Sequence, residues 1–220
     1  DYLKAEIHRE GKVFVQEYSQ GKPYKPVEVV GDADDTGTMV TFHPDPEIFQ
    51  VTTVYKYDTL AGRLRELAYL NKGIHLSLTD RRTLVNDVDE NGNELETQHY
   101  RSDVFYSKEG LREFVDYLDG GAEKLIEAPI YLETDKIIPI EIALQYNTSY
   151  TEKIYSYVNN INTIEGGTHL QGFKMGLTRT LKNYADKNGM LAKLKFDLAA
   201  DDFREGLTAV VSVKVAEPQF

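Results

Sequence analysis

The sequence predicts an α+β protein built from two units. Alternation of apolar and polar residues opens the chain, and three later strand candidates are followed by an amphipathic helix over 168–187 and a β-branched strand over 208–215. Strands followed by a long helix form layered α+β units, in which the helix covers a face of the sheet. We expect the boundary near residue 105, between units of residues 1–105 and 106–220.

The chain should begin with a β-hairpin. Residues 2–7 and 13–18 alternate on either side of a turn at Glu10-Gly11. A third strand is expected over 38–42, because it follows a turn-rich acidic segment and is closed by Pro44. The carboxylates of that acidic segment do not follow the calcium-loop pattern, so a solvated loop is the simpler interpretation.

The first predicted helix covers 58–71, with Asp58 available to cap its start and Gly73 to close its end. Its apolar stripe consists of Leu60, Leu64, Leu67 and Leu70. Residues 80–104 are then polar, with a hairpin turn signal at 90–93. We therefore expect this segment to be the most protease-sensitive part of the interior of the chain.

The second unit should start with a short helix whose N-cap is Ser107 and which stops at Gly120. Its apolar residues are Leu111, Phe114, Val115 and Leu118. Three strands of antiparallel character are expected at 129–134, 137–146 and 153–159. Pro139 lacks an N–H for a strand ladder and predicts an edge or a bulge in the second of them.

The long helix over 168–187 dominates the end of the chain and should stop at Asn188-Gly189. The side chains expected to be buried along it are Leu170, Phe173, Leu177, Leu181 and Tyr184. Asp201 is a candidate cap for a short helix, and the charges of Arg204 and Glu205 are expected to form local pairs.

Composition excludes several classes of protein. With 25 Lys and Arg against 36 Asp and Glu, the net charge is −11, which argues against a dedicated nucleic-acid binder while leaving room for a local basic patch. The absence of cysteine excludes disulfides and thiolate metal sites, and no apolar run is long enough to span a membrane. These features fit a cytoplasmic protein, and a chain that starts at Asp1 is expected to be a piece of a longer one.

Two glycines, Gly166 and Gly167, lead into the long helix, so exposed amides and a positive helix end meet at Thr168 and His169. An anion site is one interpretation of this segment. For His169 the alternatives are a local hydrogen bond at the helix start and a coupling role near an interface. The five histidines show no metal-ligand spacing.

Three separated blocks carry a resemblance to a known family. They read Glu-Gly-Gly-Thr-His-Leu-Gln-Gly-Phe-Lys-Met-Gly-Leu-Thr-Arg-Thr-Leu over 165–181, Asp-Asp-Phe-Arg-Glu-Gly-Leu-Thr-Ala-Val-Val-Ser-Val-Lys-Val over 201–215 and Leu-Arg-Glu-Leu-Ala-Tyr-Leu-Asn-Lys-Gly over 64–73. Together they resemble the ATPase subunit of bacterial type IIA DNA topoisomerases. The family includes the B subunits of DNA gyrase and topoisomerase IV, and the gyrase branch is the more similar. The resemblance covers nearly the whole chain.

The resemblance implies the C-terminal part of a GHKL (Bergerat) ATPase sandwich over 1–105. A transducer domain of the ribosomal protein S5 domain 2-like type would follow over 106–220 and end before the family's Gln-Thr-Lys loop. It also implies that Gly37 and Thr38 lie beside adenine and that Val40 lines the pocket, although a tight turn alone explains the glycine. Lys174 would face the cavity that DNA traverses, whereas a solvated face shared with Arg179 is the default interpretation.

The family's remaining ATP-site elements have no counterpart in this sequence. We find no helix with a catalytic Glu and a magnesium-binding Asn, no Asp-x-Gly-x-Gly loop, no glycine-rich lid and no P-loop. The resemblance therefore assigns no catalytic residue and no metal ligand to this chain. The chain alone is expected to bind ATP and Mg²⁺ poorly and not to hydrolyse ATP.

By resemblance, the parent protein is an ATP-dependent type II topoisomerase that negatively supercoils DNA by duplex passage. Its partners would be the gyrase A subunit, a second B subunit and double-stranded DNA. Topoisomerase IV and a non-catalytic α+β interaction module remain alternatives, while other GHKL ATPases are disfavoured by the Gly-Gly-Thr-His block at 166–169.

Overall fold

The computed structural model describes residues 1–194 and 196–219, without the side chain of Lys193. The chain forms two compact units, Asp1–Lys56 and Tyr57–Phe220. Compactness thus divides the chain after Lys56, whereas the boundary expected from the sequence lies near residue 105. The family-level division into residues 1–105 and 106–220 stays a prediction.

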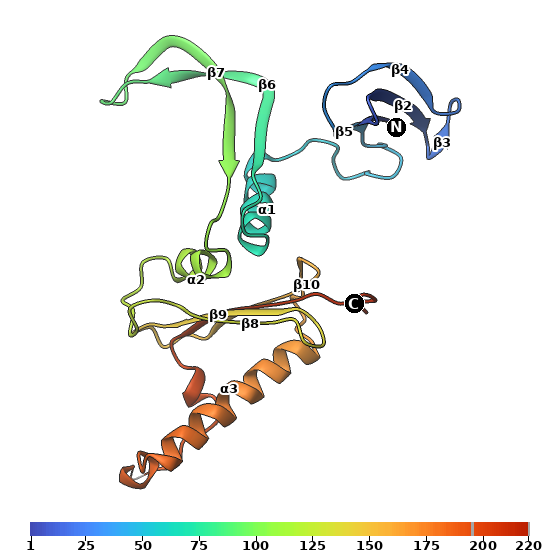
Figure 1. The fold of residues 1–220 in the computed structure, drawn as a ribbon. Coiled ribbons are helices and arrows are strands. Elements are labelled where there is room, and N and C mark those ends of the chain that lie inside the picture. Colours follow the sequence, from blue (N-terminus) through green and yellow to red (C-terminus); the bar gives the residue numbers. More distant parts are fainter. Residues whose placement is uncertain (195, 220) are drawn as a thin grey trace. The chain divides into compact units, whose positions relative to one another are not determined.

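The first unit is a small antiparallel sheet (Figure 1). Its strands are β1 (Tyr2–Arg9), β2 (Lys12–Ser19), β3 (Lys22–Pro23), β4 (Glu28–Asp32) and β5 (Gly37–His43). The order is β3-β2-β1-β5, with β4 also paired to β2. The predicted hairpin is confirmed, because Arg9 pairs with Lys12 and both turn residues, Glu10 at φ 54° and Gly11 at φ 74°, have the positive φ that a tight hairpin turn requires.

The second unit begins with α1 (Tyr57–Leu70), followed by β6 (Leu76–Val88) and β7 (Glu94–Phe105). The expected leucine stripe of α1 is only partly correct. Leu70 is buried, but the other buried side chains are Tyr57, Ala61 and Ala68, and the remaining leucines of the stripe are half-buried. Small alanines let α1 approach Phe105 of β7 closely, which explains the shift of the buried face. Asp58 pairs with Arg101 Nη2 at 2.5 Å.

The polar segment over 80–104 lies almost entirely in the β6–β7 ribbon. Its two strands pair in an antiparallel manner from Leu76–Phe105 to Val88–Glu94, with two register shifts. Most of its side chains are exposed, and Gly92 has the positive φ of 83° predicted by the turn signal. The turn is closed by Asp89, whose Oδ1 accepts the backbone N–H groups of Asn91 and Asn93.

Helix α2 (Leu111–Asp119) differs from expectation at its start. Gly110, and not Ser107, is the N-cap residue. Ser107 is fully buried, accepts the N–H of Gly110 at 2.8 Å and donates to Glu113 at 2.9 Å. Ser107 therefore fixes the turn that precedes the helix. The predicted stop is confirmed, because Gly120 ends α2 in the left-handed conformation at φ 63°.

The second sheet has an order that local pattern did not predict. Its strands are β8 (Ile130–Thr134), β9 (Ile140–Tyr146), β10 (Lys153–Val158), β11 (Ile161–Asn162) and β12 (Leu207–Val213). The order is β11-β10-β12-β9-β8, with β12 antiparallel to β9 but parallel to β10. The expected antiparallel run of β9 and β10 is thus wrong, because the last strand in sequence lies between them.

The edge position predicted from Pro139 is also wrong, because β9 lies between β8 and β12. Pro139 precedes the first ladder residue, Ile140, so its missing N–H disturbs no strand pairing. Its carbonyl accepts the backbone N–H of Lys214 at 2.9 Å. The proline therefore lies next to the inner strand without interrupting it.

Helices cover both faces of this sheet, as Figure 1 shows for α2 on one side and α3 (Thr168–Lys187) on the other. The α2 side holds a core of Leu70, Leu111, Phe114, Val115, Ala143, Tyr157 and Val210. The side facing α3 buries Leu144, Leu207 and Ala209 against the half-buried Phe173 and Leu177. Leu70 of α1 belongs to the α2 core, which explains why compactness places α1 in the second unit.

The bounds predicted for α3 are confirmed, and so is its end, since Asn188 caps the helix and Gly189 has φ 63°. The burial expected for the apolar side chains of α3 is not confirmed. No residue of α3 is fully buried, and Tyr184 is 60% exposed. Figure 1 shows the reason: the N-terminal part of α3 lies along the sheet and its C-terminal part extends away from it. Two short 3₁₀ helices, η1 (Leu191–Lys193) and η2 (Asp202–Arg204), follow before β12.

Candidate functional site

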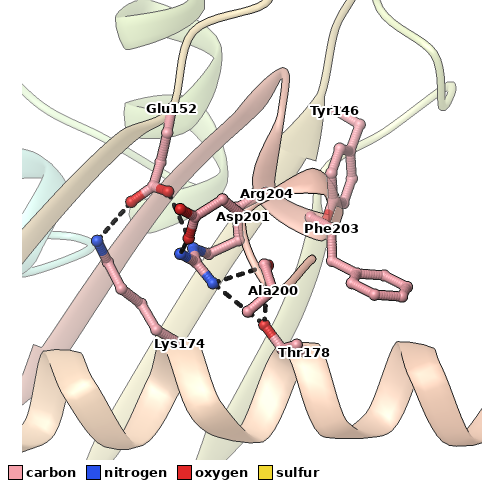
Figure 2. Close-up of polar contacts among 8 residues, drawn as sticks. All are labelled: Tyr146, Glu152, Lys174, Thr178, Ala200, Asp201, Phe203 and Arg204. Atoms are coloured by element: carbon pink, nitrogen blue, oxygen red, sulfur yellow. Dashed lines mark hydrogen bonds and ion pairs between the residues drawn. The ribbon is translucent and has the colours of Figure 1, made fainter. Parts of the chain in front are cut away.

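A cluster of charged side chains joins three segments of the second unit around Arg204, the last residue of η2 (Figure 2). The Arg204 guanidinium donates from Nε to Glu152 Oε2 at 2.9 Å and from Nη1 to Thr178 Oγ1 at 3.2 Å and to the Ala200 carbonyl at 3.0 Å. Its Nη2 contacts Asp201. One guanidinium thus connects η2 with α3 and with the residue that precedes β10.

Glu152 also forms an ion pair with a second cation through its other carboxylate oxygen. Lys174 Nζ lies 2.5 Å from Glu152 Oε1, and Figure 2 shows the two carboxylate oxygens pointing to different cations. Lys174 and Thr178 are four residues apart, so they lie on the same face of α3 and meet the cluster together. The expectation that Lys174 lies on a purely solvated helix face is therefore incomplete, because its ammonium group is tied to a partly buried carboxylate.

Backbone geometry fixes the position of Arg204. Tyr146 of β9 donates its hydroxyl to the Phe203 carbonyl at 2.6 Å. Gly206 has φ 72°, and a Cβ there would lie only 2.4 Å from the Asn147 carbonyl oxygen, so this close approach admits only glycine. The backbone is consequently fixed on both sides of Arg204 in the chain, at Phe203 and at Gly206. Only 11% of the Arg204 side chain is exposed.

The electrostatics of the cluster are balanced. Burial raises the pKa of Glu152, but hydrogen bonds from Lys174 and Arg204 together with their charges outweigh it, so the pKa lies below its ordinary value. Glu152 is therefore ionised at neutral pH. The two carboxylates Glu152 and Asp201 face the two cations Arg204 and Lys174, which is the pairing that a partly buried charge needs.

Sequence reasoning missed most of this cluster. It expected local pairing for Arg204, and of its two ion pairs only the one with Asp201, three residues earlier, is local. Glu152 lies 52 residues from Arg204 in the chain, so no helical or strand periodicity relates them. The sequence signals were Lys174, within the block over 165–181, and Arg204, within the block over 201–215.

The start of α3 contains the second candidate group. His169 Nε2 lies 3.0 Å from Thr163 Oγ1, which in turn lies 2.7 Å from Ser156 Oγ. The interpretation of His169 as a locally hydrogen-bonded helix residue is therefore confirmed. Burial lowers the pKa of His169, so the ring is neutral at physiological pH. Gly167, at φ 150°, makes room for this ring, since a Cβ there would lie 2.9 Å from it.

An open, largely apolar cavity of about 1400 Å³ adjoins His169 between the sheet and α3. Side chains of β9 and β12 form one wall, and Phe173 and Leu177 of α3 form the other. Gly172 and Gly176 directly precede these two residues on the helix, also line the cavity and carry no side chain that would fill it. The coupling role considered for His169 and an anion site at this helix start stay predictions.

The predicted adenine-site residues lie on β5, the edge strand of the first sheet. Gly37, Thr38 and Val40 are all exposed, and Thr38 and Val40 project from the same face because they are two residues apart. An edge strand supplies at most one wall of a nucleotide site. Among residues 1–194 and 196–219, no group of three or more acidic or histidine side chains is positioned to hold a metal ion.

Solved structures define the class of this protein. The 43K ATPase domain of Thermus thermophilus gyrase B, solved with an aminocoumarin, is 36% identical, has a TM-score of 0.79 and is matched over 100% of this chain and 56% of that one. A topoisomerase IV ATP-binding domain of Francisella tularensis shares the fold at 24% identity and a TM-score of 0.73, over 100% of this chain and 55% of that one. The fold is therefore that of the ATPase region of bacterial type II topoisomerases, as the sequence predicted.

Sequence comparisons identify the particular family. The family model described as DNA gyrase B matches residues 110–220, half of the chain. The DNA gyrase B protein of Eisenibacter elegans is 58% identical over 219 residues, and that of Cytophaga hutchinsonii is 56% identical over 220 residues. Each alignment covers 99% of this chain and 44% of the relative, so the chain spans less than half of their length. The chain belongs to the DNA gyrase B family.

Proposed function

We propose that this chain is part of the ATPase subunit of a type II topoisomerase that negatively supercoils DNA by duplex passage. Identity of 58% to a gyrase B protein over 99% of the chain carries the proposal. The topoisomerase IV alternative has the support of fold alone, at 24% identity. The proposed partners are a gyrase A subunit, a second gyrase B chain and double-stranded DNA, in the cytoplasm. In the described part of the chain, no helix combines the length and the apolar character needed to cross a membrane.

Within such an enzyme, we assign the second unit to coupling between nucleotide state and DNA. The charge cluster at Arg204 supports this role, because it ties α3 rigidly to the sheet at the helix midpoint. Lys174 lies at the exposed side of this junction, with 34% of its side chain accessible. A helix held in this way can transmit a displacement from one end of the unit to the other.

The test is a supercoiling assay with the complete gyrase B protein and its A-type partner. We expect ATP-dependent introduction of negative supercoils into relaxed plasmid, and a Lys174→Gln variant with reduced DNA-stimulated ATPase activity but unchanged intrinsic activity. Arg179→Gln, a neutral replacement further along the same helix, is the matched control. Relaxation or decatenation without negative supercoiling would assign the chain to the topoisomerase IV branch instead.

For ATP, we propose that Gly37, Thr38 and Val40 contribute one wall of the adenine pocket of the complete protein, where Mg²⁺ would accompany the nucleotide. The exposed hydroxyl of Thr38 can donate and accept a hydrogen bond toward a base edge or an ordered water. The chain by itself should not hydrolyse ATP, because its sequence has no counterpart of the family's helix with a catalytic Glu and a magnesium-binding Asn, and loss of a general base alone costs about 10²–10⁴ in rate. ATP turnover by the pure chain would refute this assignment.

A substitution in β5 separates the nucleotide role from a fold role. Thr38→Val keeps the shape and removes the hydroxyl, so nucleotide binding by the complete protein should weaken by about 0.5–1.5 kcal/mol. Thr41→Val, on the opposite face of the same strand, is the control that should leave binding unchanged. Equal effects of the two substitutions would show that only strand stability was changed.

A further inference from the structure

Glu152 is shared by two cations whose environments differ. Arg204 exposes 11% of its side chain and makes hydrogen bonds to four groups, whereas Lys174 exposes 34% and has Glu152 as its ion-pair partner among the residues described. The carboxylate therefore has one fixed partner and one that can leave. Lysine suits the second position, because its ammonium group is a compact charge on a flexible stem.

We propose that Glu152 is an internal counter-anion that competes with DNA phosphates for Lys174 and so restrains DNA engagement by α3. The proposal rests on the proposed function, in which Lys174 meets DNA. A phosphate that contacts Lys174 must replace a carboxylate oxygen that lies 2.5 Å from the ammonium group. The loss of this ion pair therefore offsets part of the electrostatic attraction between Lys174 and the phosphate.

The exchange leaves the rest of the cluster intact. When Lys174 moves to a phosphate, Glu152 keeps Arg204 at 2.9 Å, and Arg204 keeps Asp201, Thr178 and the Ala200 carbonyl. No charge is thus left buried without a partner, which is the condition that would make such an exchange expensive. The contact that is lost is the one between Lys174 on α3 and the residue that precedes β10.

Thermodynamic linkage gives the exchange a consequence for the protein. If DNA binding weakens the Lys174–Glu152 pair, then weakening the pair must strengthen DNA binding by the same factor. Removal of the Glu152 charge should therefore raise DNA affinity through Lys174 in particular. The net charge of −11 provides a background repulsion that any loss of a carboxylate relieves, and the experiment must separate the two effects.

The experiment measures fluorescence anisotropy of a short labelled DNA duplex with the 220-residue chain over a range of salt concentrations. The variants are Glu152→Gln, Lys174→Gln and the double variant. Glu205→Gln is the matched control, because Glu205 is exposed, lies next to Arg204 and has no ion-pair partner among the residues described. We expect Glu152→Gln to steepen the logarithmic salt dependence of binding by about 0.9, the value for one added phosphate contact, and Glu205→Gln to leave the slope unchanged.

The gain in DNA affinity caused by Glu152→Gln should disappear when Lys174→Gln is added. Glu152→Asp provides a second variant that keeps the negative charge but shortens the side chain by one methylene, which weakens the contact with Lys174, and its smaller gain in DNA affinity should also depend on Lys174. Thermal unfolding of each variant establishes that the chain is folded.

Three results would overturn the inference about Glu152. They differ in whether the DNA role proposed for Lys174 is also refuted. If Glu152→Gln behaves like Glu205→Gln, only net charge matters. If Lys174→Gln lowers affinity equally with and without Glu152, Lys174 meets DNA but Glu152 does not compete for it. If Lys174→Gln changes nothing in either background, or no variant binds the duplex at low salt, the DNA role proposed for Lys174 falls as well.

Discussion

The two five-stranded sheets of this protein contrast sharply in burial. Every residue of β12 in the second sheet is buried, whereas every residue of β4 and β5 in the first sheet is exposed. Val15 is the only buried hydrophobic residue in the first unit, all of whose residues are described. The second sheet lies between α2 and α3, and the first has no helix within its own unit.

This difference shows where stability resides. Burial of apolar side chains provides roughly 25 cal/mol per Å² removed from water, so the second unit has a core that can support it and the first has little. Strand pairing and the turns at Glu10-Gly11 and Gln20-Gly21 hold the first sheet together. We therefore expect the first unit to unfold first and the second to set the main transition.

The largest expected difference in stability comes from the same type of substitution, phenylalanine to alanine, made once in each unit. Phe114→Ala removes a side chain that is 1% exposed from the α2 core, and should lower the free energy of unfolding of the second unit by about 3–5 kcal/mol. Phe42→Ala in β5, where the ring is 52% exposed and contacts Tyr55, should cost at most about 1 kcal/mol. Urea unfolding followed by circular dichroism measures both values, and equal losses would contradict the comparison.

Ion pairs should show the same contrast at a smaller scale. Arg204→Met removes the buried partner of Glu152 and should cost about 3 kcal/mol, at the lower end for a broken buried pair, because Glu152 keeps Lys174 and the Asp201 side chain is 87% exposed. Lys25→Gln breaks an exposed pair with Glu28 in the first unit and should cost between about 0 and 1 kcal/mol. Thermal unfolding of both variants tests the prediction. A Lys25→Gln effect as large as that of Arg204→Met would remove the contrast.

The histidines of the two units should respond to pH in opposite directions. The hydrogen bond that the His8 ring donates to Asp35 raises the pKa of His8 above 6.5, so its stabilising contribution is complete below pH 6.5 and is lost as pH rises through the folded-state pKa. Glu6 also faces the His8 ring and acts in the same direction. Burial lowers the pKa of His169 below 6.5, so its contribution is complete above pH 6.5 and is lost as pH falls through the folded-state pKa.

Proton NMR titration of the two imidazole rings tests this prediction. His8 should titrate above 6.5 and His169 below it, and Asp35→Asn should return the His8 value toward 6.5 while leaving His169 unchanged. A His169 ring that titrates above its ordinary value would show that the ring is not desolvated as the structure indicates.

The smallest effect on stability is expected from cutting the β6–β7 ribbon. Its turn over 89–93 is exposed and joins strands with little buried surface, so limited proteolysis should cut there before it cuts α3. The nicked chain should keep the melting temperature of the second unit nearly unchanged, because the α2 core lies elsewhere. First cleavage within 168–187 would contradict this prediction.

How much could be predicted from the sequence follows from how local each feature is. The bounds of α3 were predictable because Gly167 and the Asn188-Gly189 pair mark its ends. The turn at Glu10-Gly11 was predictable for the same reason. The insertion of β12 between β9 and β10 was not, because strand order depends on pairing between distant segments.

The candidate site shows the same limit. Lys174 and Arg204 lay in recognisable blocks, but Glu152, which joins them, carried no pattern of its own. The burial of α3 was overestimated because an amphipathic stripe indicates which face a helix would bury, not how far the sheet beneath it extends. Residue type and spacing thus identify candidate residues, while the partner of a charge is set by the tertiary fold.

The position of β12 also has a consequence for synthesis of the protein. Its residues, Leu207–Val213, leave the ribosome after those of the other four strands, yet they form the middle of the sheet. Until they arrive, β9 and β10 present unpaired edges. The pairs that close the sheet are 55 positions apart along the chain for β10, and 61 to 73 positions apart for β9, from Leu207–Tyr146 to Val213–Ile140. Such non-local pairing is slow, and open strand edges attract other chains. During synthesis of this sheet, the nascent chain should therefore be most prone to aggregation, and most dependent on chaperones, just before β12 emerges.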